Sequence, residues 1–341
     1  RIAERLSGRP VAAVASARRG VTDHLLSLVA QVRHETANGA APHCRSVQSS
    51  DRAVASGELV AASLLAVALE QLGVRATVLD AREAGLGSDG NWGDARLVCV
   101  RPQKVRKLLG RGVVPVATGF QGWHRGRVTT LGRGGSDVTA VALAAALDAG
   151  RCELVKETGA LHTADPRLVP GALAIPRTNH RFVSELAAAG ARVIHHLAAD
   201  MAERKGVPLL FTSLESDGEP ATTVDEDTIG GEALALTHGA GRRDFPAPVS
   251  DATTLATVTL VSAAPEVAPA VRAAATAAAA HSGIAILGTS HGPHSLRFVV
   301  TLQEAVRLIR TLHAGIVGHP QPADVNSGGA KSDWRNHVGH R

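Results

Sequence analysis

Short apolar runs alternate with segments of helical periodicity through the first two thirds of the chain. Because strands that alternate with helices usually form parallel sheets with helical crossovers, this pattern predicts an α/β fold. We expect a mostly parallel sheet sandwiched by helices on both faces. The predicted strands are 11–16, 76–79, 97–100, 113–117, 152–155 and 209–212, and the predicted helices are 23–32, 58–72, 136–149 and 182–197.

The pattern changes after an acid-, Gly- and Pro-rich segment, 216–232, which is predicted to be a linker between two domains. The first domain is expected over 1–215, and a smaller α+β domain with the order β-β-α-β-β-α over 233–317. The tail 318–341 is rich in Gly, Pro, Asn and Ser and is expected to be disordered. In the smaller domain the predicted strands are 233–237, 256–262, 284–288 and 296–301, and the predicted helices are 265–281 and 302–313.

Composition excludes several function classes. The 341 residues are 45% hydrophobic, which is enough for a sizeable core. Five Phe, three Trp and no Tyr are too few aromatic side chains for a surface that stacks the bases of single-stranded nucleic acid. The net charge of +5 is spread without a basic run, so no nucleic-acid partner is expected. No apolar stretch approaches the ~20 residues of a membrane span, so no membrane partner is expected either. Three cysteines without C-x-x-C spacing indicate a reducing, cytoplasmic location and no thiolate metal site.

The stretch from Thr129 to Asp137, T-T-L-G-R-G-G-S-D, precedes a predicted helix and has the properties of an anion-binding loop. Gly134 and Gly135 allow the backbone to approach a ligand closely. Ser136 or Asp137 can cap the helix, whose N-terminal end favours negative charge. Arg133 adds a planar guanidinium suited to a carboxylate or a phosphate.

This stretch resembles the T-T-L-G-R-G-G-S-D signature of aspartate kinases, which belong to the amino-acid kinase superfamily. Other motifs of that family have similar counterparts in the same order along nearly the whole chain. They are S-A-R-R-G-V-T-D at 16–23, S-G-E at 56–58, G-F-Q-G at 119–122, T-A-D-P-R at 163–167, and E-L-A with G-A-R-V at 185–187 and 190–193.

The resemblance implies the amino-acid kinase fold and an enzyme that transfers the ATP γ-phosphoryl group to the β-carboxylate of L-aspartate. The product would be 4-phospho-L-aspartate, the first step towards lysine, threonine and methionine. The implied partners are L-aspartate and ATP with Mg²⁺ bridging phosphates, and no metal-binding residues are assigned. A carboxylate acceptor is already ionised at neutral pH, so catalysis would depend on alignment and charge neutralisation, not on a general base.

The resemblance also implies roles for individual residues. It places Arg133 and Asp137 at the catalytic centre, with Arg133 on the α-carboxylate of the substrate and Glu58 on its ammonium group. Thr22 and Ser136 would hydrogen-bond the substrate beside Gly134 and Gly135. The residues expected to face ATP are Lys156, Glu157, His162, Thr163, Ala164, Asp165, Pro166, Arg167 and Arg192.

The sequence departs from the family pattern in several places. The opening K-[FY]-G-G-T-S segment of the family has no counterpart, so the kinase domain is expected to be N-terminally incomplete or to lack its main catalytic cation. As given, the chain is expected to be a poor kinase. Two alternatives stay open: a paralogue that phosphorylates another amino acid, and a catalytically inactive ligand-binding homologue. His195 and His196 are adjacent on a predicted helix and so do not converge on one ion; they are expected near its negative end.

The smaller domain resembles an ACT domain, the amino-acid-sensing fold that aspartate kinases carry in duplicate. The sequence has room for a single ACT-like copy, with any remnant of the other within 239–254, so feedback control is expected to be altered. Because ACT domains pair between subunits, the resemblance implies a homodimer through this domain.

Overall fold

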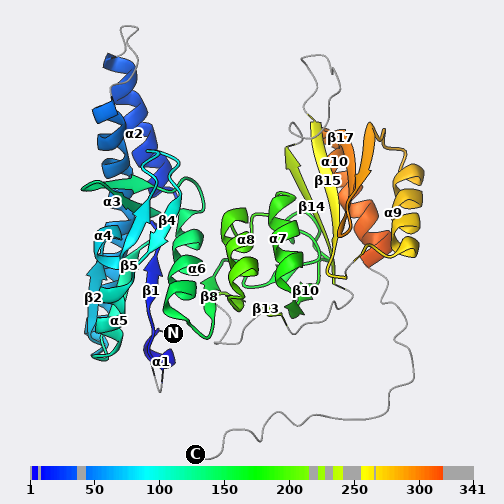
Figure 1. Cartoon of the computed structure of the whole chain (residues 1–341). Helices are drawn as coiled ribbons and strands as arrows, with labels where there is room; N and C mark the ends of the chain where they lie inside the picture. The colour runs from blue at the N-terminus through cyan, green and yellow to red at the C-terminus, as the bar shows by residue number, and fades with distance from the viewer. Residues whose placement is uncertain are drawn as a thin grey trace, which may run out of the picture.

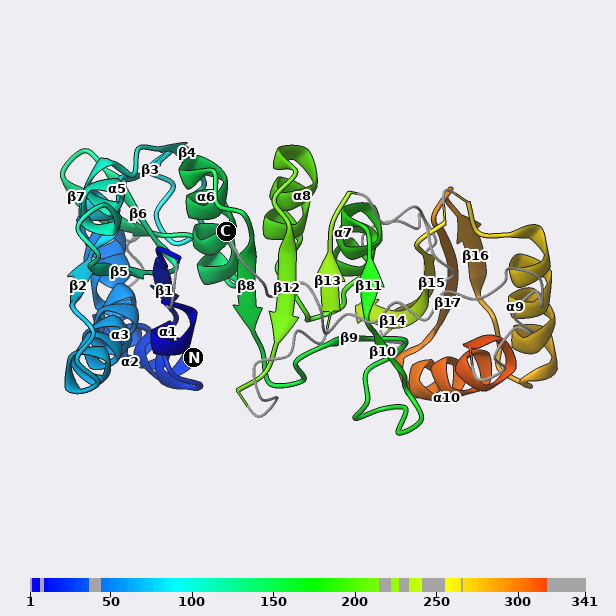
Figure 2. The same ribbon diagram turned by 90° about the horizontal axis from the view of Figure 1, so that it is seen from below.

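The structure, a computed structural model, describes residues 2–6, 9–36, 44–214, 222–226, 233–240, 255–264 and 266–317. The predicted tail 318–341 and the segment 241–254 lie outside these residues. Figures 1 and 2 show a row of three sheet-containing layers, from β1, β5 and β2 at one end to the C-terminal sheet at the other.

The first sheet is parallel and has helices on both faces. Its strands have the order β1-β5-β2, with Ala15 opposite Thr118 and Leu79 opposite Ala117. Helix α3 covers one face, with Ala62, Ala66 and Leu69 in the core, and α4, α5 and α6 cover the other. The elements are α1 (Ile2–Arg5), β1 (Ala13–Ala15), α2 (Val21–Thr36), α3 (Cys44–Gln71), β2 (Ala76–Leu79), α4 (Ala81–Ala84), α5 (Gln103–Leu109), β5 (Val114–Thr118) and α6 (Gly135–Leu147).

Helix α3 is much longer than the predicted helix 58–72. Its segment Val47–Gln71 has the length and apolar composition of a membrane span, which corrects the expectation that no stretch approaches that length. Val54, Ala55 and Ala62 on this helix are buried, and the helix lies along β1, β2 and β5. This is the position of a core helix in a folded domain.

A small second sheet joins the first layer and has the order β4-β3-β6-β7. The strand predicted at 97–100 forms within its predicted bounds, but it belongs to this separate sheet and pairs antiparallel with β3. The elements are β3 (Leu86–Ser88), β4 (Leu97–Val100), β6 (Gln121–His124) and β7 (Arg127–Thr130).

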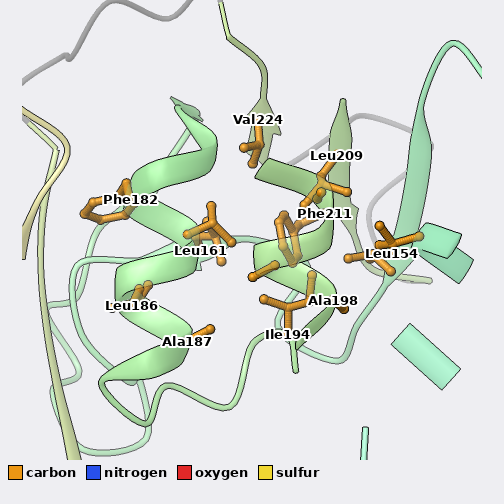
Figure 3. Close-up of a cluster of buried hydrophobic side chains, with 14 of the residues drawn as sticks. Leu154, Leu161, Phe182, Leu186, Ala187, Ile194, Ala198, Leu209, Phe211 and Val224 are labelled. Atoms are coloured by element: carbon orange, nitrogen blue, oxygen red, sulfur yellow. The ribbon is translucent and has the colours of Figure 1, made fainter. Parts of the chain in front are cut away.

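The middle layer contains a sheet of order β11-β13-β12-β8, packed against α6, α7 and α8. Figure 3 shows side chains of its core, among them Phe182 and Leu186 of α7, Ala198 of α8, and Phe211 and Leu209 of β12. The elements are β8 (Cys152–Val155), β9 (Leu161–His162), β10 (Ala174–Ile175), β11 (Arg177–Thr178), α7 (His180–Ala188), α8 (His196–Lys205), β12 (Leu209–Thr212) and β13 (Thr222–Val224).

Two predictions for this layer are wrong. The helix predicted over 182–197 is two helices, because Gly190 adopts a positive φ of 103° and ends the first one. The predicted linker 216–232 contains β13, which pairs antiparallel with β12 and parallel with β11. This short strand is held by hydrogen bonds to neighbouring strands. Such tertiary contacts cannot be predicted from the local pattern of hydrophobic residues.

The C-terminal module has the predicted order β-β-α-β-β-α, in an antiparallel sheet of order β14-β15-β17-β16. Helix α10 contacts β14, β15 and β17 and packs against α9. The strand expected at 284–288 begins only at Gly288. The elements are β14 (Leu234–Ala240), β15 (Leu255–Ser262), α9 (Pro269–His281), β16 (Gly288–His291), β17 (Ser295–Thr301), α10 (Leu302–Leu312) and a π-helix, η1 (His313–Val317). The predicted combination of an α/β unit with a smaller α+β unit is confirmed.

The core of the middle layer generates a prediction about stability. Phe211 is 1% exposed, so Phe211→Ala should lower the free energy of unfolding by about 3–5 kcal/mol through lost burial and a residual cavity. Leu214→Ala is the matched control, because Leu214 is 81% exposed and follows the same strand. Chemical denaturation followed by circular dichroism measures both. Equal losses for the two variants would contradict the assigned core.

Candidate active site

Several of the predicted site residues lie in loops that follow β1 and β5, which are parallel neighbours, and β8, which belongs to the middle sheet. Loops leave the carboxyl ends of β1, β5 and β8 beside the N-terminal end of α6. The amide of Gly119 donates to Ala15 O over 2.8 Å, which joins the first two loops. An ion pair of 2.9 Å between Arg19 and Glu157 joins the first loop to the third. In open α/β sheets, this edge is where ligands usually bind.

The glycine loop before α6 has the conformation of an anion cradle. Gly134 is the N-cap residue with a φ of 75°, and no side chain caps the helix. The prediction that Ser136 or Asp137 caps it is therefore wrong, because the left-handed Gly134 starts the helix earlier. A Cβ at Gly134 would lie 2.6 Å from Cβ of His195, and one at Gly135 would lie 2.8 Å from Cβ of Leu131. Both positions require glycine, and the N-terminal end of the helix that follows favours negative charge.

Ser136 lies against the end of β5. A Cβ at Gly119 would lie 2.6 Å from Oγ of Ser136, so this glycine leaves room for the hydroxyl. The serine is thus on the first turn of α6, beside the loops that follow β1 and β5.

Arg133 lies at the rim of the same cluster. Its Nη2 donates to Oδ1 of Asp23 over 3.0 Å, and the arginine side chain is 86% exposed. Asp23 is next to Thr22 in the first turn of α2, so this contact brings Arg133 and Thr22 to one edge of the site. An exposed ion pair contributes at most about 1 kcal/mol, so a ligand carboxylate can displace Asp23 at little cost.

Glu58 supplies a buried negative charge. The residue is 2% exposed on α3, and its Oε1 accepts a hydrogen bond of 3.2 Å from the amide of Ala17. Its Oε2 is buried without a hydrogen-bond partner within the described residues. Burial raises the pKa of this carboxyl, and the Ala17 amide opposes that rise. A buried carboxylate with one free oxygen is suited to a cationic ligand.

Asp137 joins Lys156 to the start of α8. Lys156 Nζ donates to Oδ1 of Asp137 over 2.6 Å, and the amide of His195 donates to Oδ2 over 3.1 Å. The aspartate therefore fixes a lysine close to the glycine loop, where its ammonium group can neutralise an anion.

His195 is the N-cap of α8 and lies at the positive end of a helix, which corrects its predicted place near a negative end. Burial, with a smaller contribution from His196, lowers the pKa of His195. The two rings contact each other, with centroids 4.4 Å apart. Among the described residues, no group of three or more His, Cys, Asp or Glu side chains could hold a metal ion by itself.

The segment His162–Arg167 packs against the C-terminal module, where Ala164 shares a buried cluster with Leu236. His162 is on the short strand β9, and its Nδ1 lies 3.1 Å from Ala160 O. Thr163 and Ala164 are buried. Arg167 pairs with Asp165 and holds the pKa of that carboxyl below its ordinary value. Pro166 lies between the two members of this pair.

No hydrogen bond or ion pair within the described part of the chain joins the segment 162–167 to the glycine loop. Arg192 is exposed on the turn between α7 and α8, and no ion pair of its side chain occurs within the same residues. Of the residues expected to face ATP, two are tied to the first cluster: Lys156 through Asp137, and Glu157 through Arg19.

Several residues of the site were not predicted. Arg19 and Asp23 belong to the 16–23 motif, but their pairing with Glu157 and Arg133 spans 138 and 110 residues of sequence. His195 was set aside as a helix end, and its backbone amide is the group that contacts Asp137.

Comparisons with known proteins identify the family of the chain. Residues 1–213 match the model of the amino acid kinase family. The aspartokinase of Thermus thermophilus is 38% identical over 241 residues, covering 69% of this chain and 57% of that protein. The aspartokinase of Mycolicibacterium smegmatis is 38% identical over 231 residues, covering 66% of this chain and 52% of that protein. The chain thus spans about half the length of these curated relatives.

Solved structures show the same fold. Aspartokinase III of E. coli, crystallised with aspartate and ADP, superposes with a TM-score of 0.70 at 22% identity, covering 86% of this chain and 80% of that one. The likeness therefore extends beyond residue 213 into the C-terminal module. Because the family model covers more than half of the sequence and the cluster lies where its motifs meet, the chain belongs to the amino acid kinase family.

Proposed function

We propose that the protein is an ATP-dependent aspartate kinase that forms 4-phospho-L-aspartate and ADP. The observation that carries the proposal is the buried Glu58 of α3, which accepts a hydrogen bond from the loop after β1 and has one oxygen without a partner among the described residues. A small molecule with one ammonium and two carboxylate groups matches this set of charges. The relatives named aspartokinases favour aspartate over another acceptor and over an inactive homologue.

The proposed aspartate site uses complementary charges. Glu58 binds the substrate ammonium, Arg133 exchanges Asp23 for the α-carboxylate, and Thr22 and Ser136 donate hydrogen bonds. This leaves the β-carboxylate directed towards the N-terminal end of α6. Its oxygen attacks the γ-phosphorus of ATP, the bond from that phosphorus to the β,γ-bridging oxygen breaks, and ADP leaves without a proton transfer.

The proposed phosphate site consists of Gly134, Gly135 and Lys156, with Asp137 positioning the lysine. Backbone amides and one ammonium group reduce the repulsion between the two reacting anions. The remaining nucleotide contacts are assigned to Glu157, to the segment His162–Arg167 and to Arg192. Mg²⁺ would supply further charge neutralisation, and it fits as an ion held mostly by phosphate oxygens, since Mg²⁺ commonly binds proteins through few carboxylates.

The wider proposals follow the same family relationship. The enzyme would act in the cytoplasm, at the first step towards lysine, threonine and methionine. Its C-terminal module would be a single ACT-like regulatory domain that pairs two subunits into a homodimer.

The proposal is tested by incubating the protein with MgATP and either L-aspartate or L-glutamate. We expect ADP release with aspartate and a product that hydroxylamine traps as a hydroxamate. A hydroxamate with glutamate alone would favour the paralogue, and aspartate binding without ADP release would favour the inactive homologue.

The Arg133 assignment predicts a change in substrate affinity. Arg133→Ala should raise the aspartate KM about 10- to 100-fold, because a charge-assisted contact contributes about 1.5–3 kcal/mol. The KM for ATP should change little. Arg127→Ala, which removes another exposed arginine from β7, is the matched control. An aspartate KM that stays the same in both variants would refute the assignment.

The Glu58 assignment predicts opposite effects on stability and affinity. Burial raises the pKa of Glu58 above the ordinary 4.5, so the unfolded chain releases this proton at a lower pH than the folded protein. Stability therefore falls as pH rises through that interval, and the loss persists at neutral pH. Glu58→Gln removes this cost and should raise the Tm at pH 7.5.

The same substitution should weaken aspartate binding at least tenfold, because the ammonium group loses its counter-charge. In the unaltered protein, aspartate affinity should fall as the pH drops through the raised pKa of Glu58. Titration calorimetry and thermal unfolding measure both effects, with Glu70→Gln, an exposed carboxyl on the same helix, as control. Unchanged affinity in Glu58→Gln would contradict the role.

A further inference from the structure

The segment between β9 and β10 is built into the core of the C-terminal module. Ala164 and Val169 are 3% and 6% exposed, and they belong to the same buried cluster as Leu236 of β14 and Leu308 and Leu312 of α10. The segment thus begins in the middle layer and packs among the side chains of the next one.

Thr163 is the first residue of this segment, and all its polar groups are paired. Its amide donates to Leu173 O over 2.9 Å, and its carbonyl accepts from the amide of Leu236 over 2.8 Å. Its Oγ1 accepts from the amide of Leu173 over 2.9 Å and lies 2.9 Å from Nε2 of His313. The residue therefore connects the hairpin β9–β10 to both β14 and the π-helix η1.

His313 is placed for this contact by the end of α10. The histidine is 5% exposed at the first position of η1, and burial lowers its pKa, which favours the neutral imidazole. One helical turn earlier, Arg310 Nε donates to Leu168 O over 2.8 Å. Two side chains from the C-terminal module thus hold the same segment at two points.

The contact with His313 is buried, so its loss would not be compensated fully by water. Without the imidazole, the hydroxyl of Thr163 keeps Leu173 as a donor but loses its other partner, which is unfavourable for a buried polar group. The change that would cost least free energy after loss of the imidazole is a shift of the segment that starts at Thr163. That shift would move Asp165 and Arg167, which turn outward from the buried part.

We propose that His313 is a positioning residue for the nucleotide: it holds Thr163 and thereby the segment 163–167 in the conformation that receives ATP. This inference rests on the proposed function, since it takes that segment as part of the nucleotide site. His313 itself touches neither substrate, and it acts through the Thr163 hydroxyl. The C-terminal module is then part of the nucleotide site in addition to any regulatory role.

The experiment compares His313→Ala, His313→Gln and Thr163→Val in the full chain. His313→Ala should raise the Kd for ADP about three- to tenfold, measured by calorimetry, and raise the KM for ATP equally, as expected for one lost hydrogen bond. The aspartate KM and kcat should stay within twofold. His313→Gln, whose amide can occupy the place of Nε2, should restore ADP binding to within twofold.

Two further readouts separate positioning from a general loss of structure. Combining Thr163→Val with His313→Ala should weaken ADP binding no more than Thr163→Val alone, because Thr163→Val already removes the contact with His313, together with the acceptor of the Leu173 amide. Amide hydrogen exchange in the peptide covering 163–173 should rise in His313→Ala. His294→Ala is the matched control, since His294 lies in the same module and contacts Ala264 O instead of the segment.

The outcomes are distinct. Unaltered ADP binding and exchange in His313→Ala would overturn the inference and leave the proposed kinase intact. Equal effects of His294→Ala, or additive effects in the double variant, would also overturn it. Failure of the unaltered protein to bind ADP would overturn the nucleotide assignment itself, and the inference with it.

Discussion

The carboxylate of Asp137 is the contact on which the arrangement of the site depends. It lies in the first turn of α6, a helix that contacts β1 of the first sheet and β8 of the middle sheet. Through its two oxygens it fixes Lys156 at the end of β8 and the amide of His195 at the start of α8. The glycine loop can approach His195 closely because it lacks a side chain there. One short acidic residue thus sets the position of a cation, a helix end and an anion cradle.

The buried charge of Glu58 illustrates how such a site conflicts with stability. A carboxylate that has one hydrogen bond and one free oxygen costs free energy in the empty protein. A glutamine at position 58 would avoid this cost, because its amide carries no charge. A ligand ammonium group would pair with the free oxygen, so binding would offset the free-energy cost of burying it unpaired. Arg133 differs, since it already has a partner in Asp23 and remains largely in water.

The sequence predicted the parts of the fold that depend on local pattern. Strands 76–79, 152–155 and 209–212 form within their predicted bounds, because short apolar runs between polar or glycine-containing segments favour buried strands. The break in the helix 182–197 was missed because its apolar periodicity continues through Gly190, whose positive φ overrides that pattern. Strand β13 was missed because three residues acquire a strand conformation only from their neighbours.

The same distinction, between features set by local sequence pattern and features set by tertiary contacts, applies to the site. The glycine loop was predictable because Gly134 must adopt a left-handed conformation directly before a helix. The pairing of Arg133 with Asp23 was not, because two exposed side chains separated by 110 residues meet only after the sheets and helices have packed. The segment 163–167 carries a recognisable motif, but its burial within the next module depends on the tertiary arrangement of α10 and β14.

The link between Thr163 and His313 has a consequence for how the protein is made. These residues are 150 positions apart, and the second is at the end of the last α-helix of the C-terminal module. During synthesis, the first sheet and the glycine loop emerge from the ribosome long before residue 313 does. The first sheet and the glycine loop can therefore fold before the segment around residue 165 gains its contact with His313. Under the proposed assignment, nucleotide binding would then be acquired only after residue 313 has been synthesised.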